Sequence, residues 1–189
     1  MKPLHIEKFV GALRSIPEEE FTEENVFDFL AQTRVDVDSL NSFLHFTPKF
    51  YTRNLIHKNE LFEVMALCWD AGQVSRVHNH SEQKCWMSVP VGRLRVQNFR
   101  TIENDEARRF CVLEETEGFD ISPDQPAKVE MDEPIHQVLN VSGERAVSLH
   151  VYSKPFDTCL SYCRETNQFN EVKLYYTSVY GKLCDNVKL

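Results

Sequence analysis

The chain has 189 residues, of which 42% are hydrophobic and 26% are charged, as in a soluble globular protein with one core. Its formal net charge of −8 argues against nucleic acid and anionic membrane surfaces as partners, because both are bound through basic surfaces. The sequence shows no long apolar run and no signal-peptide pattern, so we expect a cytoplasmic protein. Its six cysteines include no C-x-x-C pair, and most are expected to be reduced, buried thiols.

The first 45 residues or so are expected to be helical. Apolar side chains around Phe9 and Leu13 recur at the spacing of an amphipathic helix. Ser15 and Thr22 are candidate caps in the acidic segment that follows, whose apolar residues suggest a packed face. Residues 36–46 predict a further short helix.

From about residue 46 the pattern changes to short β-prone runs separated by turn residues such as Gly72, Gly92 and Gly118. Pro90 falls inside one run and indicates an edge or a bulge there. Many short strands at close spacing are typical of an antiparallel sandwich or barrel. We therefore expect one mainly β domain over residues 1–189, with helices over about 1–45 packed on a small barrel over about 46–189. The runs span residues 51–60, 62–72, 85–100, 107–118, 127–132, 135–142, 146–153 and 169–181.

Two histidines one residue apart, His78 and His80, suggest a metal site, because alternate residues of a strand point to the same face. His136, which begins a β-prone run after a turn, is the best candidate for a third ligand. The alternative interpretation is a solvent-exposed histidine pair. The remaining histidines lack such company and are expected to be surface or packing residues: His5, His45 and His57.

Cys85 follows His80 by five residues and could be a further ligand. Three imidazoles suit zinc, iron, copper or nickel rather than magnesium or calcium. A cysteine ligand would favour zinc, whereas an open three-histidine site would favour Fe(II). The intervals alone leave both interpretations open.

The spacing of these residues resembles the first motif of the cupin superfamily, in which the His-x-His pair and Cys85 lie between Gly72 and Gly92. His136 and Asn140 resemble the end of the second motif, although the glycine expected before the histidine is missing. Many cupins carry a glutamate ligand at the position of Cys85. The resemblance implies a jelly-roll-like barrel with a facial set of three histidines.

Three more segments resemble the cysteine dioxygenase family, the thiol dioxygenase branch of the cupins: YTRNL at 51–55, LCW at 67–69 and SLHVYSKPFDTC at 148–159. The resemblance runs from about residue 46 to 181 and implies one Fe(II) per chain. It also implies that a substrate cysteine binds the iron through its thiolate and amine. Arg53 matches the arginine that holds the substrate carboxylate, and Tyr51 matches a tyrosine near that carboxylate. The alternative for Arg53 is a surface salt bridge.

The same resemblance assigns roles to the strand around residue 150. Tyr152 matches the active-site tyrosine, and His150 matches the histidine bonded to its hydroxyl. Ser148 shares their strand face by period two and would orient His150. Cys85 matches the cysteine that becomes thioether-linked to the tyrosine, with an uncrosslinked buried thiol as the alternative. Two further residues match family positions near the site, although a core role explains the first equally well: Trp69 and Cys159.

The implied activity is oxidation of L-cysteine by O2 to cysteine sulfinic acid, a step of cysteine catabolism and taurine biosynthesis. Nothing in the sequence demands an oligomer, so we expect a monomer. The alternatives are a dioxygenase for 3-mercaptopropionate or cysteamine, and a non-catalytic cupin that binds a metal or a thiol. Asn79 and Lys154 depart from the family pattern, and Lys154 stands where a proline commonly follows a cis bond. Because of Lys154, the backbone beside Tyr152 could differ in conformation from that of the family.

Overall fold

The computed structural model describes residues 3–81, 83–123, 127–128 and 134–185. Its helical part comprises the helices α1 (Ile6–Arg14) and α2 (Glu23–Gln32) and the short 3-10 helices η1 (Glu18–Glu20) and η2 (Val37–Phe43). Thr22 caps α2 as expected, because its hydroxyl accepts a hydrogen bond from the Asn25 backbone nitrogen at 3.3 Å. Ser15 instead ends α1, where its backbone nitrogen donates to the Gly11 carbonyl at 3.1 Å.

Strands make up most of the remaining chain, with a single turn of 3-10 helix, η3 (Glu106–Arg108), between two of them. The longer strands are β1 (Thr52–Lys58), β2 (Glu63–Trp69), β4 (Lys84–Val91), β5 (Leu94–Asp105), β6 (Phe110–Ile121), β8 (Ile135–Asn140), β9 (Ala146–Ser153), β10 (Thr158–Cys163) and β11 (Gln168–Lys173). The two-residue strands are β3 (Val77–His78), β7 (Ala127–Lys128), β12 (Ser178–Val179) and β13 (Lys182–Leu183).

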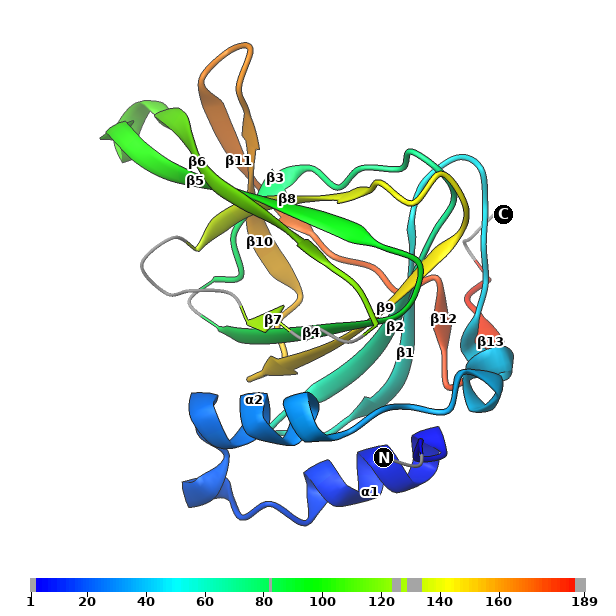
Figure 1. Cartoon of the computed structure of the whole chain (residues 1–189). Coiled ribbons are helices and arrows are strands. Elements are labelled where there is room, and N and C mark those ends of the chain that lie inside the picture. Colours follow the sequence, from blue (N-terminus) through cyan, green and yellow to red (C-terminus); the bar gives the residue numbers. More distant parts are fainter. Residues whose placement is uncertain (1–2, 82, 124–126, 129–133, 186–189) are drawn as a thin grey trace.

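The strands form two facing sheets (Figure 1). One has seven strands in the order β13-β12-β1-β2-β9-β4-β7, and the other closes on itself in the order β10-β11-β6-β5-β8-β3. Nearly all pairs are antiparallel, β1 with β12 being parallel. The predicted fold class, a cupin-type jelly-roll-like barrel with N-terminal helices, is confirmed.

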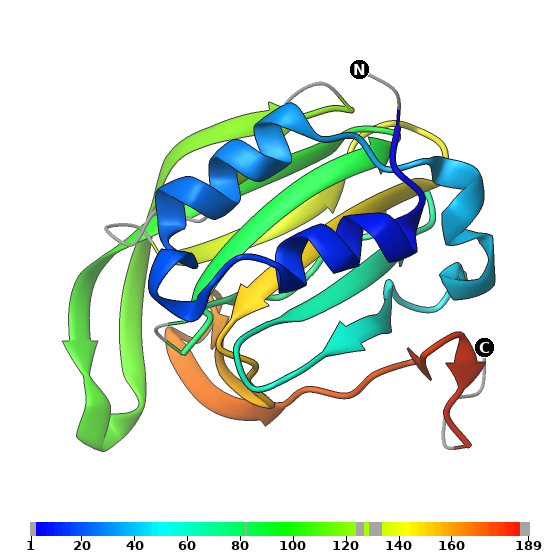
Figure 2. The same ribbon diagram turned by 90° about the horizontal axis from the view of Figure 1, so that it is seen from below.

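Helices α1 and α2 lie across the outer face of the seven-stranded sheet (Figure 2). Phe9, Leu13 and Leu30 from the helices share one buried cluster with Val64 and Ala66 of β2. The intervening residues of β2 point the other way, into the space between the sheets, since successive strand side chains alternate in direction. All seven residues of β2 are buried, because this strand is covered on both faces.

The observed strands differ from the predicted ones in some places and agree in others. Gly118 was expected in a turn but lies within β6, at a register shift against Gln97 of β5. β10 was not predicted. Pro90 does coincide with a bulge, because the pairing of β4 with β9 shifts register between Ser88 and Val91. Of the run expected at 127–132, residues 129–132 lie outside the described part of the chain.

Gly92 makes the turn from β4 to β5 and could not be replaced without strain. Its φ is +78°, and an added Cβ would lie 2.7 Å from the Cβ of Ala146 on β9. The turn therefore sets how the chain passes from β4 in the seven-stranded sheet to β5 in the facing sheet. Among the described helices, none is long and apolar enough to cross a membrane.

Candidate metal centre and active site

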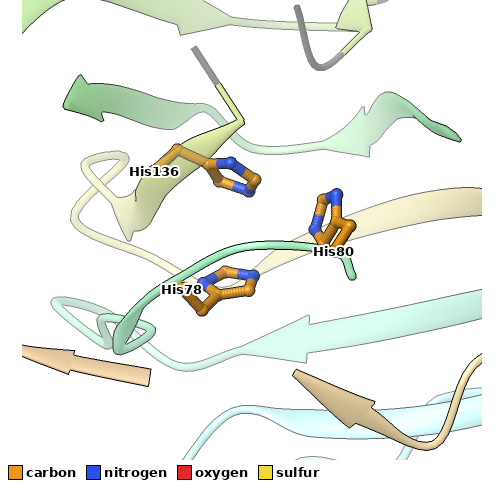
Figure 3. Close-up of side chains that lie close together, drawn as sticks. All are labelled: His78, His80 and His136. Carbon is orange, nitrogen blue, oxygen red and sulfur yellow. The ribbon is translucent and has the colours of Figure 1, made fainter. Parts of the chain in front are cut away.

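The side chains of the three predicted histidine ligands point toward one another (Figure 3). His78 on β3 is the register partner of His136 on β8, and His80 follows two residues after His78. One nitrogen from each ring lies within 4.8 Å of the others. The ring centroids are 5.3 Å apart for His78 and His80, and 4.7 Å apart for each of these with His136.

Burial keeps these imidazoles neutral. It lowers the pKa of His78 to about 4 and holds the pKa values of His80 and His136 well below the ordinary 6.5. The Nδ1 of His78 lies 2.8 Å from the Arg76 carbonyl, which orients the ring and directs its Nε2 to the cluster. Neutral, fixed imidazoles are the form in which histidine binds a metal ion.

The donor set fits a three-histidine metal ion. No carboxylate or thiol of the described residues joins the cluster, so the open positions around such an ion would be left for other ligands. The Nδ1 atoms of His80 and His136 are buried and, within the described part of the chain, have no hydrogen-bond partner. Burying polar rings without partners is unfavourable, and a bound metal ion would compensate for that cost.

A line of hydrogen-bonded polar side chains runs along β9 toward the histidine cluster. Ser148 and His150 are hydrogen bonded through Oγ and Nε2 at 2.9 Å, and the His150 Nδ1 lies 3.0 Å from the Tyr152 hydroxyl. Trp69 on β2 donates from its indole nitrogen to the Ser148 Oγ at 3.0 Å. The Tyr152 ring is 5.3 Å from the His80 ring, so the line ends beside the histidine cluster.

One placement of the protons gives every donor in this line an acceptor. Trp69 can only donate, so the Ser148 oxygen accepts from it, and the Ser148 hydroxyl proton must find another acceptor. With His150 Nε2 assigned as that acceptor, the ring proton lies on Nδ1 and faces the oxygen of Tyr152. Burial lowers the pKa of His150 to about 3, which is consistent with this neutral form. In this arrangement the Tyr152 hydroxyl donates its own proton away from His150, and the neighbouring Cys85 sulfur is within its reach.

Replacing Ser148 by alanine should destabilise the protein by about 1–3 kcal/mol, because two buried nitrogens, on Trp69 and His150, would lose their partner. Denaturant unfolding measures this effect. Ser88→Ala on the adjacent strand β4 is the control, since Ser88 is half-buried without a side-chain hydrogen bond among the described contacts. Equal stability of the two variants would show that the line has no structural role.

Cys85 lies on β4 directly opposite Tyr152 of β9, and their side chains share the inner face of the sheet. It is 3% exposed, and its Sγ lies 3.9 Å from the His150 Nδ1. Burial raises the pKa of this thiol. Cys85 is therefore beside the tyrosine and is not part of the histidine cluster.

Arg53 is half-buried on β1 and has no ion pair among the described residues. Its Nε is buried without a hydrogen-bond partner there, and its Nη2 lies 3.7 Å from the Met65 sulfur. It lines a cavity of about 600 Å³ together with Tyr51 and His78. A guanidinium held in a cavity with unsatisfied donors can bind a carboxylate of a ligand.

Comparison with known proteins identifies the family. The family model described as cysteine dioxygenase type I matches residues 7–165. The chain belongs to the cysteine dioxygenase type I family. It is 31% identical over 190 residues to cysteine dioxygenase type 1 of Danio rerio, with 96% of this chain and 90% of that protein covered. It is 33% identical over 133 residues to the Homo sapiens protein of that name, with 69% of this chain and 64% of that protein covered.

One solved structure with a similar arrangement is that of TT1209 from Thermus thermophilus. It is 20% identical, has a TM-score of 0.46, and covers 61% of this chain and 93% of its own.

The predicted residues of this cysteine dioxygenase family member lie around one cavity and one polar line. Tyr51 stacks on Trp69 with ring centroids 4.4 Å apart, and Cys159, which is 2% exposed, lines the cavity with Arg53. The peptide bond between Ser153 and Lys154 is cis. The backbone nitrogen of Lys154 donates to the Gln83 Oε1 at 2.6 Å, which ties this bend to the start of β4.

Sequence reasoning missed Glu63, a fully buried carboxylate at the start of β2. It is the register partner of Tyr152, so Glu63, Tyr152 and Cys85 form a row across three strands. Its Oε2 accepts from the Tyr176 hydroxyl at 2.5 Å and lies 3.5 Å from the Lys58 nitrogen, and these contacts hold the C-terminal segment against the barrel. A single acidic residue in an otherwise apolar run was the available signal.

Proposed function

We propose that this protein is an Fe(II)-dependent cysteine dioxygenase that converts L-cysteine to cysteine sulfinic acid with both atoms of O2. Family membership gives the activity class. The observation that carries the residue-level proposal is that a cluster of three neutral histidines contributes His78 to a cavity that also holds the unpaired Arg53, while Tyr152 lies beside the His80 ring of the same cluster. None of these features alone would distinguish an enzyme from a binding protein.

His78, His80 and His136 would hold the iron. Three imidazoles with open positions are compatible with iron and with zinc, and the absence of Cys85 from the cluster removes the argument for zinc based on a thiolate ligand. The iron would supply a coordination site for the substrate thiolate and a redox partner for dioxygen. One ion per chain is expected, because one such cluster occurs in the described residues.

Arg53 would bind the substrate carboxylate and thereby orient the thiol toward the histidines. A bidentate guanidinium–carboxylate pair fixes both position and direction, and such positioning lowers the entropic part of the barrier. Tyr51 lines the same cavity, and burial raises the pKa of its phenol, so it stays a neutral hydrogen-bond donor. Together these residues would favour a small thiol with a carboxylate.

The Tyr152 hydroxyl would donate a hydrogen bond to the oxygen that reacts with the substrate sulfur. Its oxygen accepts from His150, and burial holds its pKa well above the ordinary 10, so it acts as a donor and not as a phenolate. Ser148 and Trp69 are positioning residues here, because they act through His150.

We further propose that Cys85 forms a thioether with Tyr152. Their opposed positions on β4 and β9 support the link. Thioether formation joins a ring carbon of Tyr152 to the Cys85 sulfur and removes two hydrogens with two electrons, which O2 would accept, so the intact mass after turnover should lie about 2 Da below the sequence value. Mass spectrometry should show no deficit for Cys85→Ser, whereas Cys111→Ser, a buried cysteine on β6, should retain it. A linked peptide that contains another cysteine would contradict the assignment.

Other small thiols are the second candidates. Arg53 favours a substrate with a carboxylate, so cysteamine should be the poorest of the three thiols tested, and 3-mercaptopropionate should lack the contribution of the amine. Oxygen uptake by anaerobically iron-loaded protein, measured as kcat/KM for each thiol, decides among them. Zinc in the purified protein, with no oxygen uptake after iron replacement, would favour a binding protein instead.

The remaining expectations concern the whole chain. We propose that residues 1–189 form one domain, since α1 and α2 share a buried cluster with β2 and β9. We also propose that it acts as a monomer in the cytoplasm. All six cysteines are free, as thiols are in a reducing compartment.

A further inference from the structure

The cavity beside the histidine cluster carries charge of one sign. Its described lining includes four cations, Lys49, Arg53, Arg76 and Lys173, and no aspartate or glutamate. The whole chain, in contrast, has 29 acidic against 21 basic residues. A concave surface lined by one sign of charge focuses the local potential and attracts counter-ions even when the net charge opposes them. The cavity is therefore an exception to the acidic protein around it.

Arg76 lies immediately before β3 and is exposed. Its carbonyl orients His78, while its guanidinium has no ion pair or hydrogen bond in the described part of the chain. Arg76 also borders a neighbouring hollow whose lining includes Glu165, and that carboxylate accepts a hydrogen bond from the Cys163 sulfur at 3.1 Å. The contact with His78 holds the backbone of Arg76, and its unpaired guanidinium contributes a positive charge to the cavity.

The charge of Arg76 reaches the groups inside the cavity. Burial raises the pKa of Tyr51 and the pKa of Cys159, and the charges of Arg53 and Arg76 oppose both increases. Lys173 ends β11, beside Val172, which is the register partner of Cys159. Lys173 is exposed, and its nitrogen lies 5.9 Å from the Tyr175 ring. Both cations therefore stand at the mouth, while Arg53 is half-buried inside.

We propose that Arg76, with Lys173, is a specificity-determining cation at the mouth of this cavity, which favours thiols of net negative charge and disfavours cationic thiols. The inference rests on the proposed function. In that function the substrate carboxylate neutralises Arg53, so the two cations at the mouth remain uncompensated. An anionic thiol gains from this potential on entry, and a thiol that carries only an ammonium group is repelled.

The test uses iron-loaded protein that oxidises L-cysteine, with 3-mercaptopropionate as the anionic competitor and cysteamine as the cationic one. At low ionic strength, Arg76→Gln should raise the inhibition constant of 3-mercaptopropionate by about 3–10-fold, and Arg76→Glu by more. The inhibition constant of cysteamine should stay the same or fall. The difference should vanish near 1 M salt, where the Debye length is about 3 Å. In cysteine turnover, any loss should appear in KM and not in kcat.

Arg108→Gln is the matched control, because it removes one exposed arginine at the distant β5–β6 end. Unchanged inhibition constants in Arg76→Gln, equal changes for both competitors, or the same change in Arg108→Gln would overturn the inference while leaving the proposed function intact. If the wild-type protein oxidises no cysteine, the proposed function fails. Calorimetric titration with L-cysteine sulfinate then decides the inference, which predicts weaker binding to Arg76→Glu than to wild type and is overturned by equal binding.

Discussion

Replacing Arg53 by glutamine should lower kcat/KM for L-cysteine by about 10²–10³-fold, equivalent to about 3–4 kcal/mol of transition-state stabilisation. The size of the effect follows from the position of the side chain. Arg53 is half-buried, its Nε has no hydrogen-bond partner among the described residues, and it has no ion pair there. A substrate carboxylate would therefore be its charged partner, and charge-assisted bonds in such surroundings are among the strongest.

Cysteamine provides the control for this prediction, because it lacks the carboxylate. Its kcat/KM, which is expected to be low already, should stay the same or rise in Arg53→Gln, because cysteamine has no carboxylate to neutralise that arginine. Steady-state oxygen uptake with both thiols measures the two effects in the same preparation. An equal loss for cysteine and for cysteamine would show that Arg53 supports the structure of the site and does not recognise the carboxylate.

Replacing His136 by alanine should lower the affinity for iron by more than about 100-fold, since even losing a residue that only orients a ligand costs about 10–100-fold. His136 joins the cluster from β8, whereas the other two histidines come from one segment. Its loss would leave two imidazoles, which cannot fix the ion. Metal analysis after gel filtration should find iron in the wild-type protein and almost none in the variant, and oxygen uptake should disappear with it.

His5→Asn is the matched control for this substitution. His5 is exposed and lies before α1, where its Nδ1 accepts a hydrogen bond from the Glu7 backbone nitrogen at 3.3 Å, and asparagine can replace that contact. This variant should keep its iron and its activity. Stoichiometric iron with full turnover in His136→Ala would contradict the three-histidine centre.

Period-two reasoning predicted that three polar residues share one strand face, whereas the family resemblance was needed to place that face at the site. Ser148, His150 and Tyr152 alternate along β9, so their shared face followed from the sequence once the strand was recognised. The meeting of His136 with His78 was a weaker prediction, because strand pairing depends on contacts far apart in the chain. The register between β3 and β8 shows it directly.

Other features could not be predicted from local patterns. β10 has no clear alternation of polar and apolar residues, and it is fixed by pairing with β11 and β3 on its two sides. The position of Gly118 inside β6 arises from a register shift, which no single-strand pattern contains. The importance of Glu63 and Arg76 depends on what faces them across the fold, namely Tyr152 and the cavity.

The most direct test of the proposed reaction is oxidation of L-cysteine by the iron-loaded protein under ¹⁸O2, with mass spectrometry of the product. Both sulfinate oxygens should carry the label, because a dioxygenase transfers both atoms of one O2 molecule to the substrate sulfur. Cystine as the main product, or a sulfinate with one oxygen from water, would contradict the account.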